Sequence, residues 1–446
     1  MTMRRAREYG RSAARPVGPM RPDGAVHTVH PALLRAFAAL DGAGVAWCLL
    51  RGEARLADPS GDVDLLVDPT DLPRLDAVLV TAGFLPVPGV GKGAHRGYVG
   101  HATGDRFLEL DFESSVEFGP SSHFAVNWLR PTLRTDAAQA LLAGRRRVGR
   151  LAVPSADDAF WALLLHCVVD KGAVAERHAA RLVELAPQAR PDGVLGRIVT
   201  AHCPSGWDAA RVLTAARGTD WPALVALGAR LPGRATAAGR AAALGRGLRR
   251  LATDVRRTRR GLSVAVLGPD GAGKSTLTQG IAAAFGLPTR VVYMGLWQGE
   301  DGAARALPLA ALAAARRPFR SWRRAAVTGW HQARGRLVVL DRHPYDALLP
   351  PTPPHVALKR LFFTLLAHTV PAPSVVLILD VPAEVAAFRR PDEDPGALAT
   401  LRSEYLSLAR RLPRAVVLDA DRSPEALRAA AIDRIWQAVL DAETRR

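Results

Sequence analysis

The chain has 446 residues, a length that allows two or three domains, and 48% of them are hydrophobic, so each domain can bury a core. The formal net charge is +18, but only four of the 60 Lys and Arg residues are lysines, which indicates a compositional bias and does not favour a nucleic-acid-binding stripe. Three scattered cysteines exclude a disulfide or zinc framework. No long apolar run lacks a charge and no apolar segment follows the Arg-rich N-terminus, so we expect a cytoplasmic protein without membrane contact.

Residues 1–260 divide into three predicted segments. Residues 1–28 are rich in Arg, Gly and Pro, which predicts a disordered arm. Residues 29–153 predict an α+β unit, with helices over 31–41 and 72–82 and strands over 45–50, 63–67, 97–101 and 107–112. Helical periodicity dominates residues 154–260, so we expect a helical domain that ends in an Ala/Arg/Gly-rich linker over 234–260.

A new pattern begins at residue 261 and runs to 446, where short apolar strands alternate with helices. Strands are expected over 262–267, 290–294, 336–340, 374–380 and 415–418. Helices are expected over 274–285, 303–326, 355–369, 382–390, 397–411 and 424–441. Continuous apolar strands separated by helices predict an α/β domain with a parallel sheet covered on both faces.

The segment from Gly268 to Thr276 reads G-x-x-x-x-G-K-[ST], and it joins an apolar strand to a helix. Glycines allow the backbone N–H groups to turn toward phosphates, and the following helix presents its positive end to them. Lys274 is then expected to reach the β- and γ-phosphates of ATP, and the Ser275 hydroxyl to bind Mg²⁺. The residues expected to hold the nucleotide are Gly268, Asp270, Gly271, Ala272, Gly273, Lys274, Ser275 and Thr276.

A second acidic position follows the strand over 336–340. Asp341 stands at the carboxyl end of this strand, where ligands bind in open α/β sheets. A carboxylate there can hold Mg²⁺ through water, and Arg342 would point at phosphate oxygens.

These segments resemble thymidylate kinases in sequence and order. The motifs that carry the resemblance are Gly268-Pro-Asp-Gly-Ala-Gly-Lys-Ser-Thr276, Asp341-Arg342-His343, Leu379-Asp380-Val-Pro-Ala-Glu384 with Arg389-Arg390, and Val417-Leu418-Asp419-Ala420. The resemblance implies that Arg342 binds the acceptor or the transferred phosphate, and that Arg389 and Arg390 begin a lid that stabilises charge on the moving phosphoryl group. It also implies that Asp270 lies near the acceptor and that the kinase forms a homodimer.

The chain departs from that family at two places. The acidic-Arg-Pro-Gly-Gly segment that helps to hold the acceptor nucleotide is missing after the second strand, where the chain reads Tyr293-Met-Gly-Leu-Trp297. The lid, over 389–396, is short. ATP binding therefore carries over, whereas dTMP, another nucleotide and a small hydroxylated or phosphorylated metabolite all stay open as acceptors.

A second set of carboxylates stands in the N-terminal unit. Asp62 and Asp64 share one face of a predicted strand because side chains alternate with period 2, and Asp111 lies on another strand. Three converging carboxylates can hold Mg²⁺ ions that activate a nucleophile and steady a leaving pyrophosphate. Together with Arg51-Gly52 and the helical region, these residues resemble nucleotidyltransferases of the polymerase-β superfamily, although the usual Gly-Ser turn is replaced.

Three functions follow from these patterns. The first is an ATP- and Mg²⁺-dependent kinase acting on a nucleotide or small metabolite, fused to a nucleotidyltransferase-like unit. The second is a nucleotidyltransferase that acts on a small molecule, RNA or protein. In that case the P-loop domain over 261–446, which carries the phosphate-binding loop, has an auxiliary role. The third is an NTP-dependent regulator that binds nucleic acid through its positive charge.

Overall fold

The computed structural model describes residues 28–52, 55–59, 61–87, 96–119, 132–231, 260–296, 307–351, 355–391 and 393–445. The predicted N-terminal arm and the predicted linker over 234–260 lie outside these residues, apart from the last residue of each. In the described ranges, no helix combines the length and the apolar character needed to cross a membrane.

The first sheet has five strands in the order β1-β2-β5-β4-β3. Strands β2 and β5 run parallel, and the other neighbours are antiparallel. The strands are β1 (Trp47–Leu49), β2 (Asp62–Val67), β3 (Phe84–Val87), β4 (Arg96–His101) and β5 (Phe107–Glu113). The sequence pattern did not predict β3, which has four residues and contains Pro86, and which lies at the edge of the sheet where a proline is tolerated.

The two faces of this sheet pack against different helices. Helices α1 (Pro31–Gly42) and α2 (Leu72–Thr81) share a core with Val63, Leu65 and Val67, which alternate along β2. The opposite face of β2 carries Leu66, which packs into a core built largely by helices after residue 155. Because Asp62 and Asp64 share the parity of Leu66, they lie on the face that turns toward those helices.

Helices dominate residues 156–228. They are α4 (Ala156–Leu165), the π-helical turn η4 (His166–Lys171), α5 (Glu176–Leu185), the 3₁₀ turn η5 (Ala186–Gln188), α6 (Val194–His202), α7 (Ala209–Arg217) and α8 (Trp221–Gly228). Small elements precede them: β6 (Glu117–Phe118), β7 (Leu133–Arg134), α3 (Ala138–Ala143), β8 (Arg146–Val148) and β9 (Leu151–Val153). Ser155 begins α4 as its N-cap, since its hydroxyl accepts a hydrogen bond from the Asp158 N–H.

The second sheet confirms the predicted parallel α/β architecture. Its order is β11-β12-β10-β13-β14, and every neighbouring pair is parallel. The strands are β10 (Ser263–Leu267), β11 (Thr289–Tyr293), β12 (Leu337–Asp341), β13 (Val375–Asp380) and β14 (Ala415–Asp419). The helices are α10 (Lys274–Ala284), α11 (Leu307–Ala333), α12 (Val356–Thr369), α13 (Ala383–Arg389), α14 (Pro395–Arg411) and α15 (Pro424–Thr444), with a 3₁₀ turn η6 (Pro344–Leu348) after β12.

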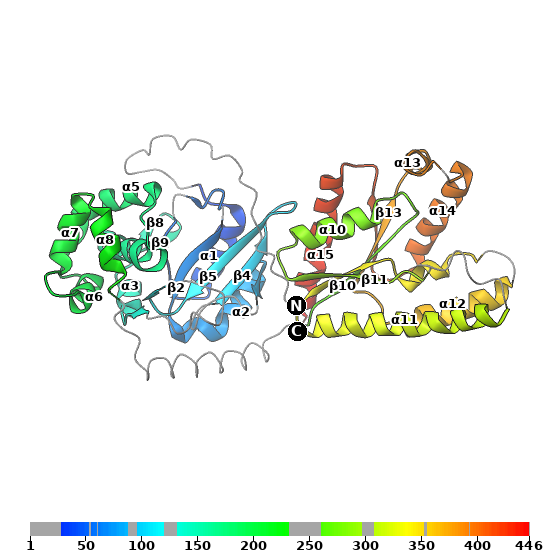
Figure 1. Ribbon diagram of the computed structural model, residues 1–446, viewed down its shortest axis with the longest axis horizontal. Helices are drawn as coiled ribbons and strands as arrows, with labels where there is room; N and C mark the ends of the chain where they lie inside the picture. The colour runs from blue at the N-terminus through cyan, green and yellow to red at the C-terminus, as the bar shows by residue number, and fades with distance from the viewer. Residues whose placement is uncertain are drawn as a thin grey trace.

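Helices cover both faces of the second sheet. Val264 and Val266 turn to the face packed by α10, α13 and α15, while Ala265 and Leu267 turn to the face packed by α11, α12 and α14. In Figure 1, strands β4 and β5 of the first sheet reach toward α10 and α15 of the second half. Leu85 and Val99 from the first sheet belong to the same buried cluster as the core under α10 and α15, so the two halves share apolar contacts.

Candidate functional site

The predicted phosphate-binding loop joins β10 to α10 at the carboxyl end of the parallel sheet. Gly268, Gly271 and Gly273 have φ values of +145°, +79° and +86°. Residues other than glycine rarely adopt this backbone conformation. At Gly268, an added Cβ would also lie 2.9 Å from the Leu379 carbonyl oxygen on β13. The glycines therefore meet a real backbone requirement, and the loop places the start of α10 toward the ligand side of the sheet.

Lys274 is buried inside this loop. Its Nζ donates to the carbonyl oxygens of Gly268 at 2.8 Å and Pro269 at 2.7 Å, and to Asp270 Oδ1 at 3.1 Å. Burial and the nearby Arg342 lower the pKa of Lys274, and Asp270 partly offsets them. An ammonium group held by carbonyl groups can exchange them for phosphate oxygens, which are stronger acceptors.

Arg342 meets the same carboxylate from the end of β12. Its Nη2 donates to Asp270 Oδ1 at 2.6 Å, so this oxygen is shared by Arg342 and Lys274. Burial acts to raise the pKa of Asp270, but Lys274 and Arg342 outweigh it and hold that pKa below its usual value. Arg342 also has φ +68°, a strained backbone conformation for a side chain of this size. The structure thus brings Asp270, Lys274 and Arg342 together at the mouth of the loop.

The two residues predicted to hold Mg²⁺ are also adjacent. The hydroxyl of Ser275, at the start of α10, donates to Oδ2 of Asp341, at the end of β12, over 3.1 Å. A serine hydroxyl and a carboxylate are oxygen ligands of the kind that Mg²⁺ prefers, and they stand beside the expected phosphate site. This donor set fits the ion.

The predicted lid residues lie against the loop. Arg389, at the end of α13, donates to the Gly271 carbonyl oxygen at 3.2 Å. The side chain of Arg390 lies beside Gly271, since an added Cβ there would be 3.4 Å from Arg390 Cγ. Asp380, the acidic end of β13, is bound by Arg402 of α14 through both carboxylate oxygens, at 2.6 and 3.0 Å. Asp380 is therefore tied to the helix after the lid.

Sequence reasoning missed two residues on the ligand side of the sheet. Asp346 lies on η6, just after β12, and Tyr405 lies on α14. The Tyr405 hydroxyl donates to Asp346 Oδ1 at 2.9 Å. They are separated by 59 positions in the chain, and neither belongs to a motif, so only the folded arrangement reveals the pair.

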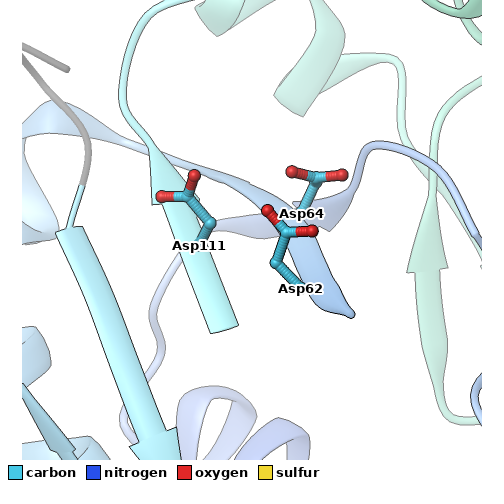
Figure 2. Close-up of side chains that lie close together, drawn as sticks. All are labelled: Asp62, Asp64 and Asp111. Carbon is cyan, nitrogen blue, oxygen red and sulfur yellow. The ribbon is translucent and has the colours of Figure 1, made fainter. Parts of the chain in front are cut away.

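The N-terminal carboxylates also converge. Strands β2 and β5 are paired in parallel so that Asp62 lies opposite Glu109 and Asp64 opposite Asp111. One ligand oxygen from each of Asp62, Asp64 and Asp111 lies within 4.8 Å of the other two. Figure 2 shows the three carboxylates gathered at this pair of strands. Oxygen atoms at such spacing are suited to a divalent cation, so the predicted convergence fits Mg²⁺.

Arg51 neutralises part of this acidic cluster. Its Nε lies 2.8 Å from Asp64 Oδ2, and its Nη2 lies 4.0 Å from Glu113 Oε1. Burial raises the pKa of Asp64, and it acts to lower that of Arg51, but Asp64 and Glu113 outweigh burial and raise the pKa of Arg51. Arg51 thus places a guanidinium beside a predicted metal ligand.

The helical region supplies polar groups near this cluster. His166 pairs its Nδ1 with Asp170 Oδ2 at 2.8 Å within the π-helical turn η4. Asp170 Oδ1 also accepts a hydrogen bond from the Gly119 N–H at 2.5 Å. These contacts fix the turn against the segment that follows β5.

No protein-family model and no curated protein sequence matches this chain. Among solved structures, the chain is similar to thymidylate kinase from Candida albicans, with 16% identity over 41% of this chain and 93% of that one, and a TM-score of 0.31. It is also similar to deoxyadenosine kinase from M. mycoides with bound dATP, with 14% identity over 39% of this chain and 99% of that one, and a TM-score of 0.30. Likenesses at these scores assign no function to this chain.

Proposed function

We propose that the chain is an ATP- and Mg²⁺-dependent phosphotransferase of the nucleoside monophosphate kinase type, with a nucleotide or small metabolite as acceptor. The observation that carries the proposal is the cluster of Lys274, Asp270 and Arg342 beside the paired Ser275 and Asp341, all at the end of a parallel sheet. Glycines with positive φ let the loop fold around phosphates, and the start of α10 adds its positive end. The kinase-type homodimer and the cytoplasmic location stay predictions.

In this proposal, catalysis rests on positioning and on neutralising charge. The Lys274 ammonium leaves the loop carbonyls and binds the β- and γ-phosphates. Ser275 and Asp341 would hold Mg²⁺, and the ion would neutralise negative charge on the phosphates. Arg342, Arg389 and Arg390 stabilise negative charge on the moving phosphoryl group, the latter two from the side of α13 that contacts Gly271.

The test measures ADP formation from ATP and Mg²⁺ with a panel of nucleosides, nucleoside monophosphates and small alcohols. Lys274→Ala is expected to lower the rate by about a thousandfold, because it removes the ammonium that contacts the transferred phosphate. Lys359→Ala on α12 is the matched control, since it removes a lysine away from the loop and is expected to leave the rate unchanged. Equal rates in the Lys274→Ala variant and the wild type would refute the proposal.

A second candidate function belongs to the N-terminal unit. The specific observation in its favour is the approach of Asp62, Asp64 and Asp111 to within 4.8 Å. We infer that these carboxylates would hold Mg²⁺ for a nucleotidyltransferase that releases pyrophosphate from a nucleoside triphosphate. The double variant Asp62→Ala, Asp64→Ala is expected to abolish pyrophosphate release while ADP formation persists. If pyrophosphate release survives this change, the carboxylates have no such role.

A further inference from the structure

The proposed function does not use Asp346, a carboxylate that lies near Lys274 and Arg342. Asp346 lies on η6 after β12, at the end of the sheet where ligands bind in α/β folds. The carboxylate is half-buried, and its Oδ1 accepts the hydrogen bond from the Tyr405 hydroxyl at 2.9 Å. Among the described residues, no hydrogen bond is found to its second oxygen, Oδ2. One oxygen is thus anchored from α14 while the other can receive a donor.

Charge at this place is already balanced. Arg342 and Lys274 both contact one oxygen of Asp270, at 2.6 and 3.1 Å, and Asp346 adds a second carboxylate near the same two cations. The charges of Lys274 and Arg342 are already neutralised by the carboxylates of Asp270 and Asp346. An acceptor that carries a phosphate dianion would therefore be repelled by these two carboxylates. Within the described part of the chain, the remaining cations at the loop are Arg389 and Arg390, which lie on the lid side against Gly271. A neutral alcohol avoids this repulsion.

We propose that Asp346 binds the hydroxyl group of the acceptor, so that the enzyme phosphorylates an alcohol rather than a phosphate monoester. The inference rests on the proposed phosphotransferase function and narrows its acceptor class. Tyr405 is a positioning residue, because its hydroxyl fixes the Asp346 carboxylate from α14. Arg342 is left to bind the transferred phosphoryl group.

The step balances with ATP as the phosphoryl donor. The acceptor oxygen forms a new bond to the γ-phosphorus of ATP, and the bond from that phosphorus to the β,γ-bridging oxygen breaks. ADP leaves with the bridging oxygen. The proton of the acceptor hydroxyl passes to Asp346 Oδ2. Because phosphoryl transfer has a loose transition state, the carboxylate acts mainly by orienting the hydroxyl and taking its proton late.

The ionisation of Asp346 suits this role. Burial raises the pKa of Asp346 to about 6, although Arg342, Lys274 and the Tyr405 hydrogen bond act in the opposite direction and Asp270 adds to the rise. A carboxylate with such a pKa is ionised near neutral pH and is a stronger base than an exposed aspartate. The charged and titratable groups that face it come from β12, α10, α14 and the loop, namely Arg342, Lys274, Tyr405 and Asp270.

The test uses inorganic phosphate as a probe for a phosphate-bearing acceptor. The full chain is saturated with Mg²⁺ and a non-hydrolysable ATP analogue, which occupies the donor phosphate positions, and phosphate binding is measured by calorimetry at pH 8. The wild type is expected to bind phosphate weakly. Asp346→Asn keeps the shape and the Tyr405 contact but removes one negative charge, so it is expected to bind phosphate about tenfold more tightly. Asp441→Asn near the end of α15 is the matched control, with no expected change.

Equal phosphate affinity in the wild type and Asp346→Asn overturns the inference, while tighter binding in the variant alone supports it. Failure of the ATP analogue to bind overturns the proposed function as well, so this result distinguishes failure of the proposed function from failure of the Asp346 assignment alone.

Acceptor pairs that differ only in one phosphate, such as thymidine and dTMP, give a second readout. Transfer to the alcohol member, with kcat lowered about a hundredfold and KM little changed in Asp346→Asn, supports the inference. Transfer to the monophosphate member supports a kinase but overturns the assignment of Asp346.

Discussion

At the scale of single residues, Asp346 links pH to stability. Its pKa is raised from 3.8 to about 6. Between these two values the folded state binds more protons than the unfolded state, so the free energy of unfolding falls as pH rises from about 4 to 6. The stabilising contribution of the protonated group is therefore present below pH 4 and lost above pH 6.

We predict that Asp346→Asn abolishes the fall in the free energy of unfolding that the ionisation of Asp346 causes between pH 4 and pH 6. Relative to the wild type, the variant should gain about 2–3 kcal/mol of unfolding free energy between pH 4 and pH 8, measured by urea denaturation. Asp441→Asn, a change of the same charge on the last turns of α15, serves as the control. A difference between wild type and Asp346→Asn that does not vary with pH would contradict the assignment.

The ion pair of Arg51 and Asp64 illustrates a second effect at this scale. Arg51→Met keeps most of the side-chain volume but leaves Asp64 without the guanidinium that lies 2.8 Å away. We expect the free energy of unfolding to fall by about 3 kcal/mol, since a partly buried carboxylate loses its partner. Mn²⁺ or Mg²⁺ should recover part of the loss, because an ion bound to the folded state alone stabilises it.

Arg147→Met is the matched control for that variant. Arg147 pairs with Asp41 at 2.6 Å, but the arginine side chain is 50% exposed and the aspartate 35%, compared with 24% and 15% for Arg51 and Asp64. Exposed pairs contribute less than about 1 kcal/mol. Losses of equal size in the two variants, or no response of Arg51→Met to the metal, would argue against a charged site at the first sheet.

At the scale of elements, strong local patterns predicted the second sheet well. Strands β10, β12 and β13 are buried and largely apolar, and the five observed strands begin and end within one position of the expected ones. Helix α11 was expected to end at 326 but continues to Ala333, and Thr328 and His331 in this last part are buried. β3 was missed because four residues with a proline carry little periodic signal.

The local sequence pattern does not predict which elements pair with one another, or in which register. The alternation along β2 predicted that Asp62 and Asp64 share a face, but only the sheet register places Asp64 opposite Asp111. Similarly, Asp346 meets Tyr405 because η6 and α14 pack together, and no motif spans the positions between them. Contacts of this kind depend on tertiary packing, which one sequence read locally does not reveal.

The turn between β10 and α10 yields a prediction for a single methyl group. Gly271 has φ +79°, and a Cβ there would lie 3.1 Å from the Ala386 carbonyl oxygen of α13. Gly271→Ala should therefore displace the loop from α13 and weaken binding of an ATP analogue by about tenfold, measured by calorimetry. Gly149→Ala shares the backbone cost, with φ +57°, but has no neighbour within 4 Å. If both variants bind the analogue as the wild type does, the loop does not need its observed conformation.

At the scale of the whole molecule, the contact between the two halves connects the two candidate sites. Phe107 begins β5, the strand that also carries Asp111, and its ring lies 5.3 Å from the rings of both Phe285 and Trp436. Phe285 directly follows α10, the helix that starts at Lys274. Arg428 of α15 adds an ion pair to Asp105 just before β5. Strand β5 thus leads from the carboxylate site, and helix α10 from the phosphate loop, to the same aromatic contact.

This arrangement predicts that the halves are stabilised by one another. Phe107→Ala should lower the free energy of unfolding by about 2–4 kcal/mol through lost packing between the halves. Gly286→Ala approaches the same contact from the other side, because its new Cβ would lie 2.5 Å from Phe107 Cδ1 and force the interface apart. Phe319→Ala on α11 is the control, since that ring is 70% exposed. Scanning calorimetry should show the thermal transitions of the two halves separating in Phe107→Ala and Gly286→Ala but not in Phe319→Ala. Unchanged transitions in both interface variants would mean that the halves unfold independently, and that their shared apolar cluster stabilises neither.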